Sequence, residues 1–415
     1  MKRMTKCVAM LTLTGTVQFS QSTIAASTEP NPIVTAQSSP DSDMQLPADN
    51  AFAAPSSLPF HTPAFDKIRL EHYQPAFTVG MKQQLVEMEA IASQKEAATF
   101  DNTIVAIEKS GALLTRVRNV FSNMTSAEKS KDLQNIETEL APLQAAHSDN
   151  ILLNRGLFTR VERLYEARDT LGLNEEQREV LKQHYESFVR AGAKLDEGQQ
   201  ARIRVLNEQL SMLETKFEEN LLAITEERSV FIDNAAELTG MNEAAIRAAA
   251  EGAEKRGKAG KYLLEITNTT RVPLLTSLNN RTTRQRIWEA SAFRGLGRDG
   301  GIDNRPLILE IDQLRAERAK LLGFPNHSAY KLQNQMAETP DAARKMLADL
   351  VPGVLAKVNI EAADLKAMIK ASGADHELEA WDWEYYSEKV RKERFEVDEA
   401  AVEPYFELDS VLKNG

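Results

Sequence analysis

The fold is decided by the stretch IRVLNEQLSMLETKFEENL, residues 203–221. Its large apolar residues recur at intervals of three and four positions: Ile203, Leu206, Leu210, Leu213, Phe217 and Leu221. Because an α-helix has about 3.6 residues per turn, this spacing puts the whole set on one face. We therefore expect a long amphipathic helix whose apolar face packs against the rest of the protein.

A second apolar stripe has the same helical spacing. It consists of Leu133, Ile136, Leu140, Leu143 and His147. Between residues 76 and 272 the one proline is Pro142, and few prolines permit long helices because each proline removes a backbone hydrogen bond. The sequence therefore predicts a mostly α protein of roughly a dozen helices.

Helix ends are also visible in the sequence. Asn174 and the pair Thr339-Pro340 are typical of helix starts, because a short polar side chain can accept a hydrogen bond from the first turn and proline fits the first helical position. Glycines that can adopt a left-handed backbone are typical of helix ends, and three fit: Gly192, Gly323 and Gly373.

Two short β-like runs interrupt the helical pattern. Ser229–Ile232 and Tyr262–Thr267 flank an alanine-rich helical segment, Asn242–Arg256. They could pair as a small hairpin-like insertion, but the chain has no set of strands large enough for a core sheet. The predicted fold is thus mostly α with a small two-strand insertion.

Composition excludes several classes of protein. The 415 residues contain 50 Lys and Arg against 61 Asp and Glu, a formal charge of −11. This acidic balance argues against a nucleic-acid-binding surface, which needs clustered basic residues. The single cysteine, Cys7, excludes an intrachain disulfide and a cysteine-rich metal site.

The first 26 residues are typical of a secretory signal peptide. A basic start with Lys2, Arg3 and Lys6 is followed by an apolar run over 7–17 and by small residues up to Ala26. The run is too short for a membrane-spanning helix. Cleavage near Ala26 would remove Cys7 and leave 47 basic against 61 acidic residues, a charge of −14. We expect export to a bacterial-type periplasm without a membrane anchor; the alternative is an unprocessed, disordered N-terminus.

The residues after the signal peptide are low in apolar periodicity. Ser27–Pro63 is rich in Pro, Ser, Ala and Asp, a composition that favours disorder. We assign residues 27–58 to a disordered linker and 59–415 to the folded helical part.

The motifs of common hydrolases are absent from the sequence. A helical zinc site needs His-Glu-x-x-His, because two imidazoles four residues apart share a helix face. His376-Glu377 is followed by Ala380 where the second histidine should stand, so no metal ligand and no catalytic residue can be named. The sequence has no Gly-x-Ser-x-Gly elbow, although a Ser/His/Asp triad is not excluded by spacing alone. The glycine-rich residues 295–301 lack Gly-Lys-Ser/Thr and indicate an interhelical loop.

An aromatic cluster is the most unusual local composition. Residues 381–386 include Trp381, Asp382, Trp383, Tyr385 and Tyr386. Such clusters can form a wall that contacts a peptide, because they combine a large area with polar edges. An aromatic anchor that docks a helix onto the body is an equally good interpretation.

Several motifs resemble one known family, the bacterial peptidyl-dipeptidases, or dipeptidyl carboxypeptidases, of the thimet-oligopeptidase-like zinc metallopeptidases. The resemblance runs in order from Leu58 to the C-terminus. It is carried by Leu58-Pro59-Phe60, Pro63-Ala64-Phe65-Asp66-Lys67-Ile68, His72-Tyr73-Gln74-Pro75-Ala76-Phe77, Phe100-Asp101-Asn102-Thr103-Ile104, Ala146-His147-Ser148-Asp149, Phe188-Val189-Arg190-Ala191-Gly192-Ala193, Leu322-Gly323-Phe324-Pro325-Asn326-His327, Trp381-Asp382-Trp383 with Tyr385-Tyr386, and Pro404-Tyr405-Phe406-Glu407-Leu408.

The resemblance implies a fold and an activity. Members are helical ellipsoids with two lobes around a deep cleft, and they release dipeptides from the C-termini of oligopeptides. Their Zn²⁺ is held by His-Glu-x-x-His and a later Glu, beyond the part that this chain resembles. We therefore expect the N-terminal half of such an enzyme, with no zinc ligand to carry over and no activity alone. The five residues of the aromatic cluster become candidates for contact with the oligopeptide.

Two consequences follow from that resemblance. A half-enzyme should expose apolar helix faces and therefore self-associate or aggregate. The alternatives to a peptidase are a non-catalytic helical binding or scaffolding protein and a fragment without function.

Overall fold

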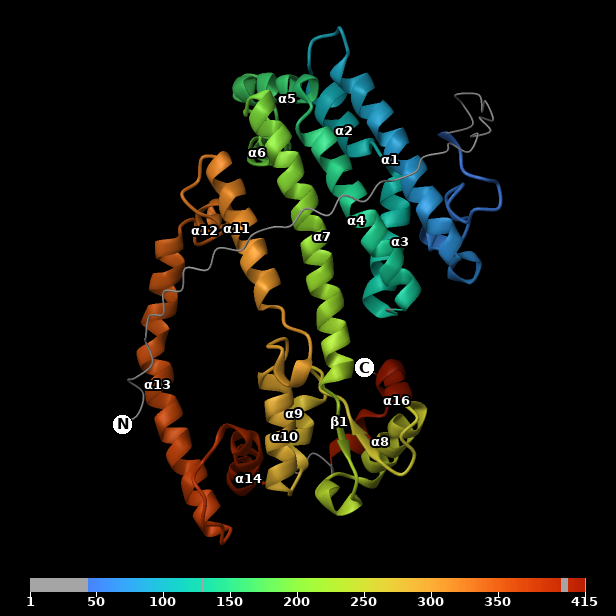
Figure 1. Ribbon diagram of the computed structural model, residues 1–415. Coiled ribbons are helices and arrows are strands. Elements are labelled where there is room, and N and C mark those ends of the chain that lie inside the picture. The colour runs from blue at the N-terminus through green and yellow to red at the C-terminus, as the bar shows by residue number, and fades with distance from the viewer. Residues whose placement is uncertain (1–43, 129, 397–401, 415) are drawn as a thin grey trace, which may run out of the picture. The chain divides into compact units, whose positions relative to one another are not determined.

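The computed structural model describes residues 44–396, apart from residue 129, and residues 402–414 (Figure 1). The predicted signal peptide and residues 27–43 of the predicted linker lie outside these residues. Within them the secondary structure is almost entirely helical, with one pair of short strands, as the sequence predicts. No helix in this part of the chain is long and apolar enough to cross a membrane.

The helices and strands follow one another in this order: α1 Leu70–Ala92, the π-helical turn η4 Phe100–Val105, α2 Ala106–Lys109, α3 Ala112–Ala127, α4 Lys131–Leu152, α5 Arg155–Ala167, α6 Glu175–Ala191, α7 Glu197–Glu227, β1 Val230–Ile232, α8 Glu243–Lys255, β2 Tyr262–Leu264, α9 Arg271–Ser277, α10 Arg281–Ala292, α11 Arg305–Leu321, α12 His327–Leu332, α13 Pro340–Ala371, the 3₁₀ turn η7 Ala380–Asp382, α14 Trp383–Phe395, the 3₁₀ turn η8 Glu403–Phe406 and α16 Leu408–Asn414.

Helix α7 is the long helix predicted from residues 203–221. It packs against α4 and α11, and α4 and α7 run side by side in Figure 1. Ile203, Leu206 and Leu210 are buried, as expected, whereas Leu213 and Phe217 are half-buried and Leu221 is exposed. The predicted face is therefore buried over its first half. Apolar spacing identifies a face, but the face is buried only where another element covers it.

Helix α4 shows the same pattern. Leu133, Leu140 and His147 of its predicted stripe are buried, and Ile136 is half-buried. Leu143 is exposed, which corrects the prediction at that position. His147 is held inside by a hydrogen bond of 2.7 Å between its Nε2 and Oε1 of Gln84 on α1.

The folded part begins earlier than the sequence predicts. Phe52, inside the segment assigned to a disordered linker, is 2% exposed and packs in a core cluster with Tyr73 and Phe121. Arg116 donates a hydrogen bond of 2.9 Å to the Phe52 carbonyl oxygen. The segment around Phe52 is thus attached to the helical core, because Phe52 and the partly buried Leu46 supply apolar area to it.

The predicted helix ends are confirmed. The side chain of Asn174 accepts a hydrogen bond of 2.8 Å from the Gln177 amide, and that of Thr339 accepts one of 3.2 Å from the Ala342 amide. The three predicted glycines follow helices with positive φ: Gly192 at 110°, Gly323 at 83° and Gly373 at 77°. A side chain would be strained in this left-handed conformation.

The two-strand insertion is also confirmed. β1 and β2 pair antiparallel, with Phe231 opposite Leu263, and α8 packs against β2. The glycine-rich residues 295–301 connect α10 to α11, as expected of an interhelical loop. Leu296 forms a β-bridge with Asp303 there, so backbone hydrogen bonds close this loop.

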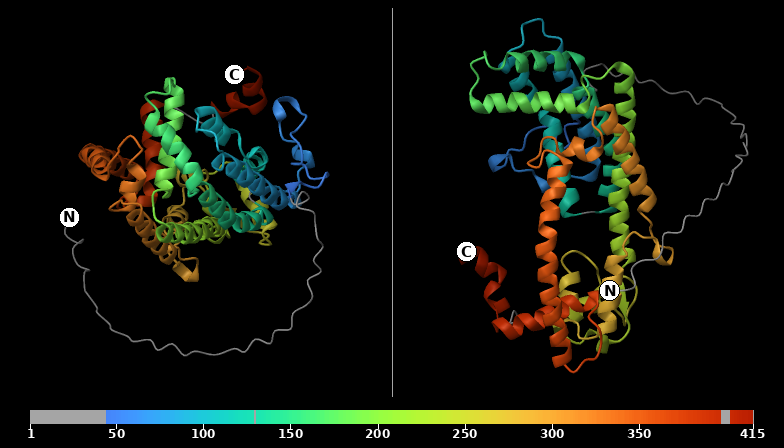
Figure 2. Two further views of the ribbon diagram at one scale, coloured as in Figure 1. Left: turned by 90° about the horizontal axis from the view of Figure 1, so that it is seen from above. Right: turned by 90° about the vertical axis from the view of Figure 1, so that its left-hand side faces the viewer.

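Helix α13 is joined to the rest of the described chain mainly at its two ends. It contacts α12 near its start and α14 near its end (Figure 1). Every residue from 344 to 360 is exposed. Helix α13 is one long, unbroken helix in Figure 1 and in the right-hand view of Figure 2.

Candidate substrate-side site around Asp382

The aromatic cluster predicted from the sequence lies where α14 begins. Ala380–Asp382 form the 3₁₀ turn η7, and Trp383 is the first residue of α14. The carboxylate of Asp382 accepts a hydrogen bond of 3.2 Å from the backbone amide of Glu379. This local hydrogen bond closes the turn and places the Asp382 side chain against α10.

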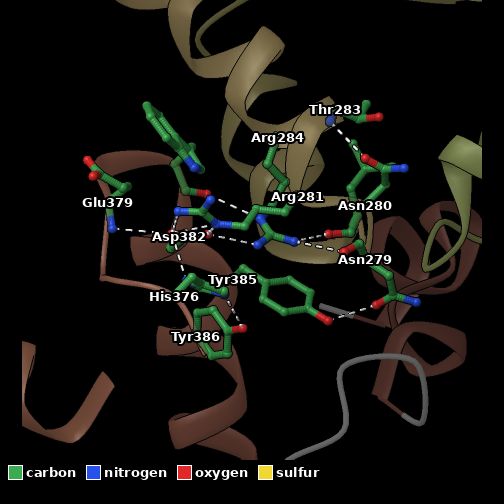
Figure 3. A network of polar contacts seen from close by, with 12 residues as sticks. Asn279, Asn280, Arg281, Thr283, Arg284, His376, Glu379, Asp382, Tyr385 and Tyr386 are labelled. Atoms are coloured by element: carbon green, nitrogen blue, oxygen red, sulfur yellow. Dashed lines mark hydrogen bonds and ion pairs between the residues drawn. The ribbon is translucent and has the colours of Figure 1, made fainter. Parts of the chain in front are cut away.

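Asp382 is the centre of a network of polar contacts with two arginines of α10 (Figure 3). Arg281 donates from Nη2 to Oδ2 at 2.8 Å, and Arg284 donates from Nη2 to Oδ1 at 2.9 Å. The side chains of Asp382 and Arg284 are 0% and 1% exposed, whereas that of Arg281 is 35% exposed. Because the arginines stand three residues apart, they project from the same side of α10.

Arg284 connects three segments of the chain. Its Nη1 donates to the carbonyl oxygens of Leu278 and Asn279 at 2.9 and 3.0 Å, in the turn after α9. Its Nε donates to the carbonyl oxygen of Trp381 at 3.2 Å. A single buried guanidinium therefore holds together the end of α9, α10 and the start of α14, and the planar donor fork of arginine suits that task.

The two arginines set the charge state of Asp382. Burial raises the pKa of this carboxyl group, but the hydrogen bonds from Arg281 and Arg284 outweigh burial and leave the pKa below its ordinary value. Asp382 is therefore ionised near neutral pH, with its oxygens occupied. An ionised and occupied carboxylate is a structural anion and is poorly placed to move protons in a reaction.

His376 and Tyr386 border this network. Nδ1 of His376 lies 3.8 Å from Oδ2 of Asp382, and its Nε2 lies 3.3 Å from the Tyr386 hydroxyl oxygen. Tyr386 is 4% exposed and packs in a small core cluster with Leu365 and Ile369 of α13. The His376 side chain is partly exposed, at 23%.

Trp381 and Tyr385 pack against residues of α10, and Trp383 packs against the cluster of Leu365, Ile369 and Tyr386. The Trp381 ring meets the Trp288 ring edge to face at 5.9 Å, and the Arg284 guanidinium stacks 4.0 Å from the centre of the Tyr385 ring. The Tyr385 hydroxyl donates to Oδ1 of Asn279 at 2.9 Å. Trp381, Trp383 and Tyr385 nevertheless stay half-buried.

The structure thus brings all five predicted residues together at one junction. Asp382 and Tyr386 are buried, as in the aromatic-anchor interpretation, while Trp381, Trp383 and Tyr385 keep accessible surface. Contact of these residues with a peptide stays a prediction. Sequence reasoning missed Arg281 and Arg284, because two arginines three apart on a charged helix give no signal that one of them is fully buried.

The residues of this site do not fit a zinc ion. In the described chain no group of three or more His, Cys, Asp or Glu side chains is placed to hold a metal. Within this site His376 and Asp382 are the side chains that could bind a metal, and they supply two ligands at most. Arg281 and Arg284 already occupy the Asp382 carboxylate. Zinc prefers four ligands. The side chains around Asp382 therefore do not form a metal site.

A cavity of about 830 Å³ lies elsewhere, between α6 and the α11–α12 region. Its lining is mostly polar and includes Lys182, Arg190, Phe324, Gln333 and Glu338. Arg190 donates a hydrogen bond of 2.8 Å to the Gln333 side chain across it. None of the five predicted site residues lines this cavity, so pocket and predicted site are distinct features.

Part of the chain matches a known family of peptidases. Residues 274–415, which include α10, α13 and α14, match the family model described as peptidase family M3. The mostly α fold and this match confirm the resemblance that the sequence motifs indicated: over most of its length the chain is similar to peptidases of family M3.

The chain is also similar to individual peptidases, two of them named dipeptidyl carboxypeptidase. The chain is 38% identical over 366 residues to the dipeptidyl carboxypeptidase of Escherichia coli K12, which covers 88% of this chain and 54% of the relative. The Salmonella typhimurium dipeptidyl carboxypeptidase is 38% identical over 360 residues, covering 87% and 53%. Oligopeptidase A of E. coli is 29% identical over 355 residues, covering 85% and 52%. The chain therefore spans about half the length of these relatives.

Proposed function

We propose that the chain is part of a zinc-dependent peptidyl-dipeptidase. Such an enzyme releases dipeptides from the C-termini of oligopeptides in peptide catabolism. The observation that carries this proposal is the 38% identity, over 366 residues, to a protein named dipeptidyl carboxypeptidase. The lower identity to oligopeptidase A, 29% over 355 residues, favours dipeptide release over a more general oligopeptidase activity.

In this proposal the chain supplies part of the wall that contacts the peptide. The half-buried rings of Trp381, Trp383 and Tyr385 offer apolar area with polar edges, which suits peptide contact. Asp382 and Tyr386 act beneath them as positioning residues, because their buried contacts fix the start of α14.

Peptide binding can be tested by the quenching or enhancement of tryptophan fluorescence. The probe is an oligopeptide with a blocked N-terminus and a free C-terminus. We expect Trp383→Ala to weaken binding at least fivefold, and Phe395→Ala, at an exposed position on the other end of α14, to leave it unchanged. Equal binding by the wild type and Trp383→Ala would refute a substrate-side role for the cluster.

Catalysis by this chain alone is a separate question. The 415 residues contain no His-Glu-x-x-His. We propose that the isolated chain binds no zinc tightly and does not release dipeptides, the metal ligands belonging to a segment outside this sequence. Metal analysis of the purified protein together with a dipeptide-release assay tests this, and stoichiometric, tightly held zinc would refute it.

The second candidate function is a non-catalytic helical binding or scaffolding protein. It is favoured by the absence of a three-donor group among the histidines and acids that the structure describes. The coding DNA downstream of Gly415 discriminates between the two. An in-frame continuation that carries His-Glu-x-x-His supports the peptidase, and a stop codon supports the scaffold.

The proposed location is the periplasm. It rests on the basic start, apolar run and small residues of 1–26. N-terminal sequencing of the exported, folded protein should begin close to residue 27. Retention of Met1 would contradict processing.

A further inference from the structure

The polar cavity of about 830 Å³ beside α6 is separate from the aromatic site. Three parts of the chain supply most of its lining: α6, the residues that follow α11 and the turn that follows α12. Its volume lies within the range of small-molecule sites, about 300–1,000 Å³. The charges and hydrogen-bonding groups of the lining indicate which class of ligand it takes.

Arg190, near the end of α6, presents an unpaired positive charge to this cavity. Its Nη1 donates a hydrogen bond of 2.8 Å to Oε1 of Gln333, and its guanidinium lies 4.5 Å from the centre of the Tyr330 ring. These contacts hold the side chain in place but use one of its five N–H donors. Among the residues that the structure describes, no carboxylate forms an ion pair with Arg190. A guanidinium held in this way suits a carboxylate, which it can bind through two parallel hydrogen bonds.

Glu186 presents a negative charge to the same cavity. It lies four residues before Arg190 on α6, and side chains four residues apart on a helix are neighbours. The two could form an ion pair, but the Arg190 guanidinium bonds to Gln333 instead. Glu186 forms no ion pair with any described residue. The cavity therefore has a positive and a negative charge at neighbouring positions that do not neutralise each other.

The rest of the lining suits a short peptide. The side-chain amides of Asn334 and Gln335 can each donate and accept hydrogen bonds, as a peptide group does. The ring of Tyr185 is stacked on that of Tyr165 with 3.9 Å between the ring centres, and Phe324 lines the cavity as well. These rings offer apolar surface for small side chains.

We propose that this cavity binds short peptides with free termini, whose carboxylate pairs with Arg190 and whose ammonium group pairs with Glu186. A dissolved zwitterion brings both charges with it. A stretch of polypeptide that covered the cavity without two matching charged side chains would bury Arg190 and Glu186 unpaired, which is strongly unfavourable. Binding at this site does not require the proposed peptidase activity, and none of the five residues of the aromatic cluster lines the cavity.

Isothermal titration calorimetry of the full chain at pH 7 tests the charge requirement, with dialanine as the probe. We expect dialanine to bind. Dialanine amide lacks the carboxylate and N-acetyl-dialanine lacks the ammonium group, so each should bind at least tenfold more weakly than dialanine. This comparison uses the wild type alone and does not depend on the folding of any variant.

Variants then place the ligand in the cavity. Arg190→Gln should weaken the binding of dialanine at least tenfold and leave that of dialanine amide unchanged, because both changes remove the same charge pair. Arg271→Gln is the matched control. Arg271 is also half-buried and also without an ion pair to a described residue, but it lies at the start of α9 and does not line the cavity. Its replacement should leave dialanine binding unchanged.

Several results would overturn the proposal. A wild-type chain that does not bind dialanine excludes this class of ligand. Equal binding of dialanine and its amide, or equal binding of dialanine by Arg190→Gln and the wild type, excludes Arg190 as the partner of the carboxylate. Trp383→Ala should leave dialanine binding unchanged, and a loss there would place the ligand at the aromatic cluster, so the two sites are tested separately. Circular dichroism of each variant shows whether the helices are retained.

Discussion

Removal of the Asp382 carboxylate should destabilise the junction of α9, α10 and α14 strongly. In Asp382→Ala the guanidinium of Arg284, which is 1% exposed, keeps its bonds to the carbonyl oxygens of Leu278, Asn279 and Trp381 but loses its counter-ion. Loss of one partner of a buried ion pair costs about 3–5 kcal/mol. Arg281 adds little to this cost, because its side chain is 35% exposed and can be hydrated.

The three tryptophans of the chain provide the assay. Trp288, Trp381 and Trp383 all lie at this junction, so intrinsic fluorescence reports its unfolding. Urea titration at pH 7 should show a lower midpoint for Asp382→Ala, equivalent to about 3–5 kcal/mol in the free energy of unfolding. Glu317→Ala is the control: its ion pair with Arg202 is 2.7 Å long but 42% exposed on both sides, and its loss should cost less than about 1 kcal/mol.

A double variant separates burial of charge from loss of packing. Arg284→Met with Asp382→Leu removes both buried charges, so we expect it to be more stable than Asp382→Ala. A cost below about 1 kcal/mol for Asp382→Ala, or a double variant as unstable as the sum of its two single changes, would refute this reasoning.

The lowered pKa of Asp382 gives the same experiment a pH dependence. Its carboxyl group has a lower pKa in the folded state than in the unfolded chain, where it titrates at about 3.9. Its contribution is therefore complete at pH values well above 4 and is lost as the pH falls through the folded-state pKa, because the unfolded chain binds the proton first. The difference in stability between the wild type and Asp382→Asn should be constant above about pH 5 and shrink in more acidic solution.

Three further predictions concern the rest of the fold. Phe52→Ala should lower the free energy of unfolding by about 3–5 kcal/mol, because Phe52 is 2% exposed, whereas Phe60→Ala, at a fully exposed ring, should change it little. Urea titration followed by circular dichroism measures both variants. Equal effects would show that Phe52 does not belong to the folded core. Gly240→Ala should lower the melting temperature markedly, because Gly240 has a φ of 101° and a side chain there would collide with the Ser277 carbonyl oxygen. An unchanged melting temperature would contradict this close contact. The pKa of His147 should lie below the ordinary histidine value of 6.5, because burial, and to a smaller extent the charge of Arg118, disfavour the imidazolium. The contribution of the neutral His147 to stability is therefore lost as the pH falls below 6.5, where the unfolded chain binds the proton first. An NMR titration that gives His147 an ordinary or raised pKa would be inconsistent with its burial.

Much of the fold could be predicted because it depends on local periodicity. The three-and-four spacing of α7, the polar caps at Asn174 and Thr339 and the glycines after α6, α11 and α13 all act within a few residues, and each agrees with the structure. The extent of burial could not be read in this way. Leu143 and Leu221 continue apolar stripes yet are exposed, because coverage depends on where the neighbouring helices end.

The candidate site was predictable in composition and unpredictable in its chemistry. The density of aromatic residues over 381–386 identified a special segment, but the two arginines that occupy Asp382 lie about 100 residues earlier in the chain. No sequence signal connects residues at that separation unless the path of the chain is known.

By itself the sequence determined the helices, the small strand insertion, the resemblance to family M3 and the absence of the His-Glu-x-x-His motif, since each is written in neighbouring residues. Tertiary structure alone decided that Asp382 is a buried structural anion, that Phe52 belongs to a core and that residues 344–360 of α13 are exposed. The physical reason is that the environment of a side chain is set by which distant segments pack against it, and a local pattern specifies a face without specifying its neighbour.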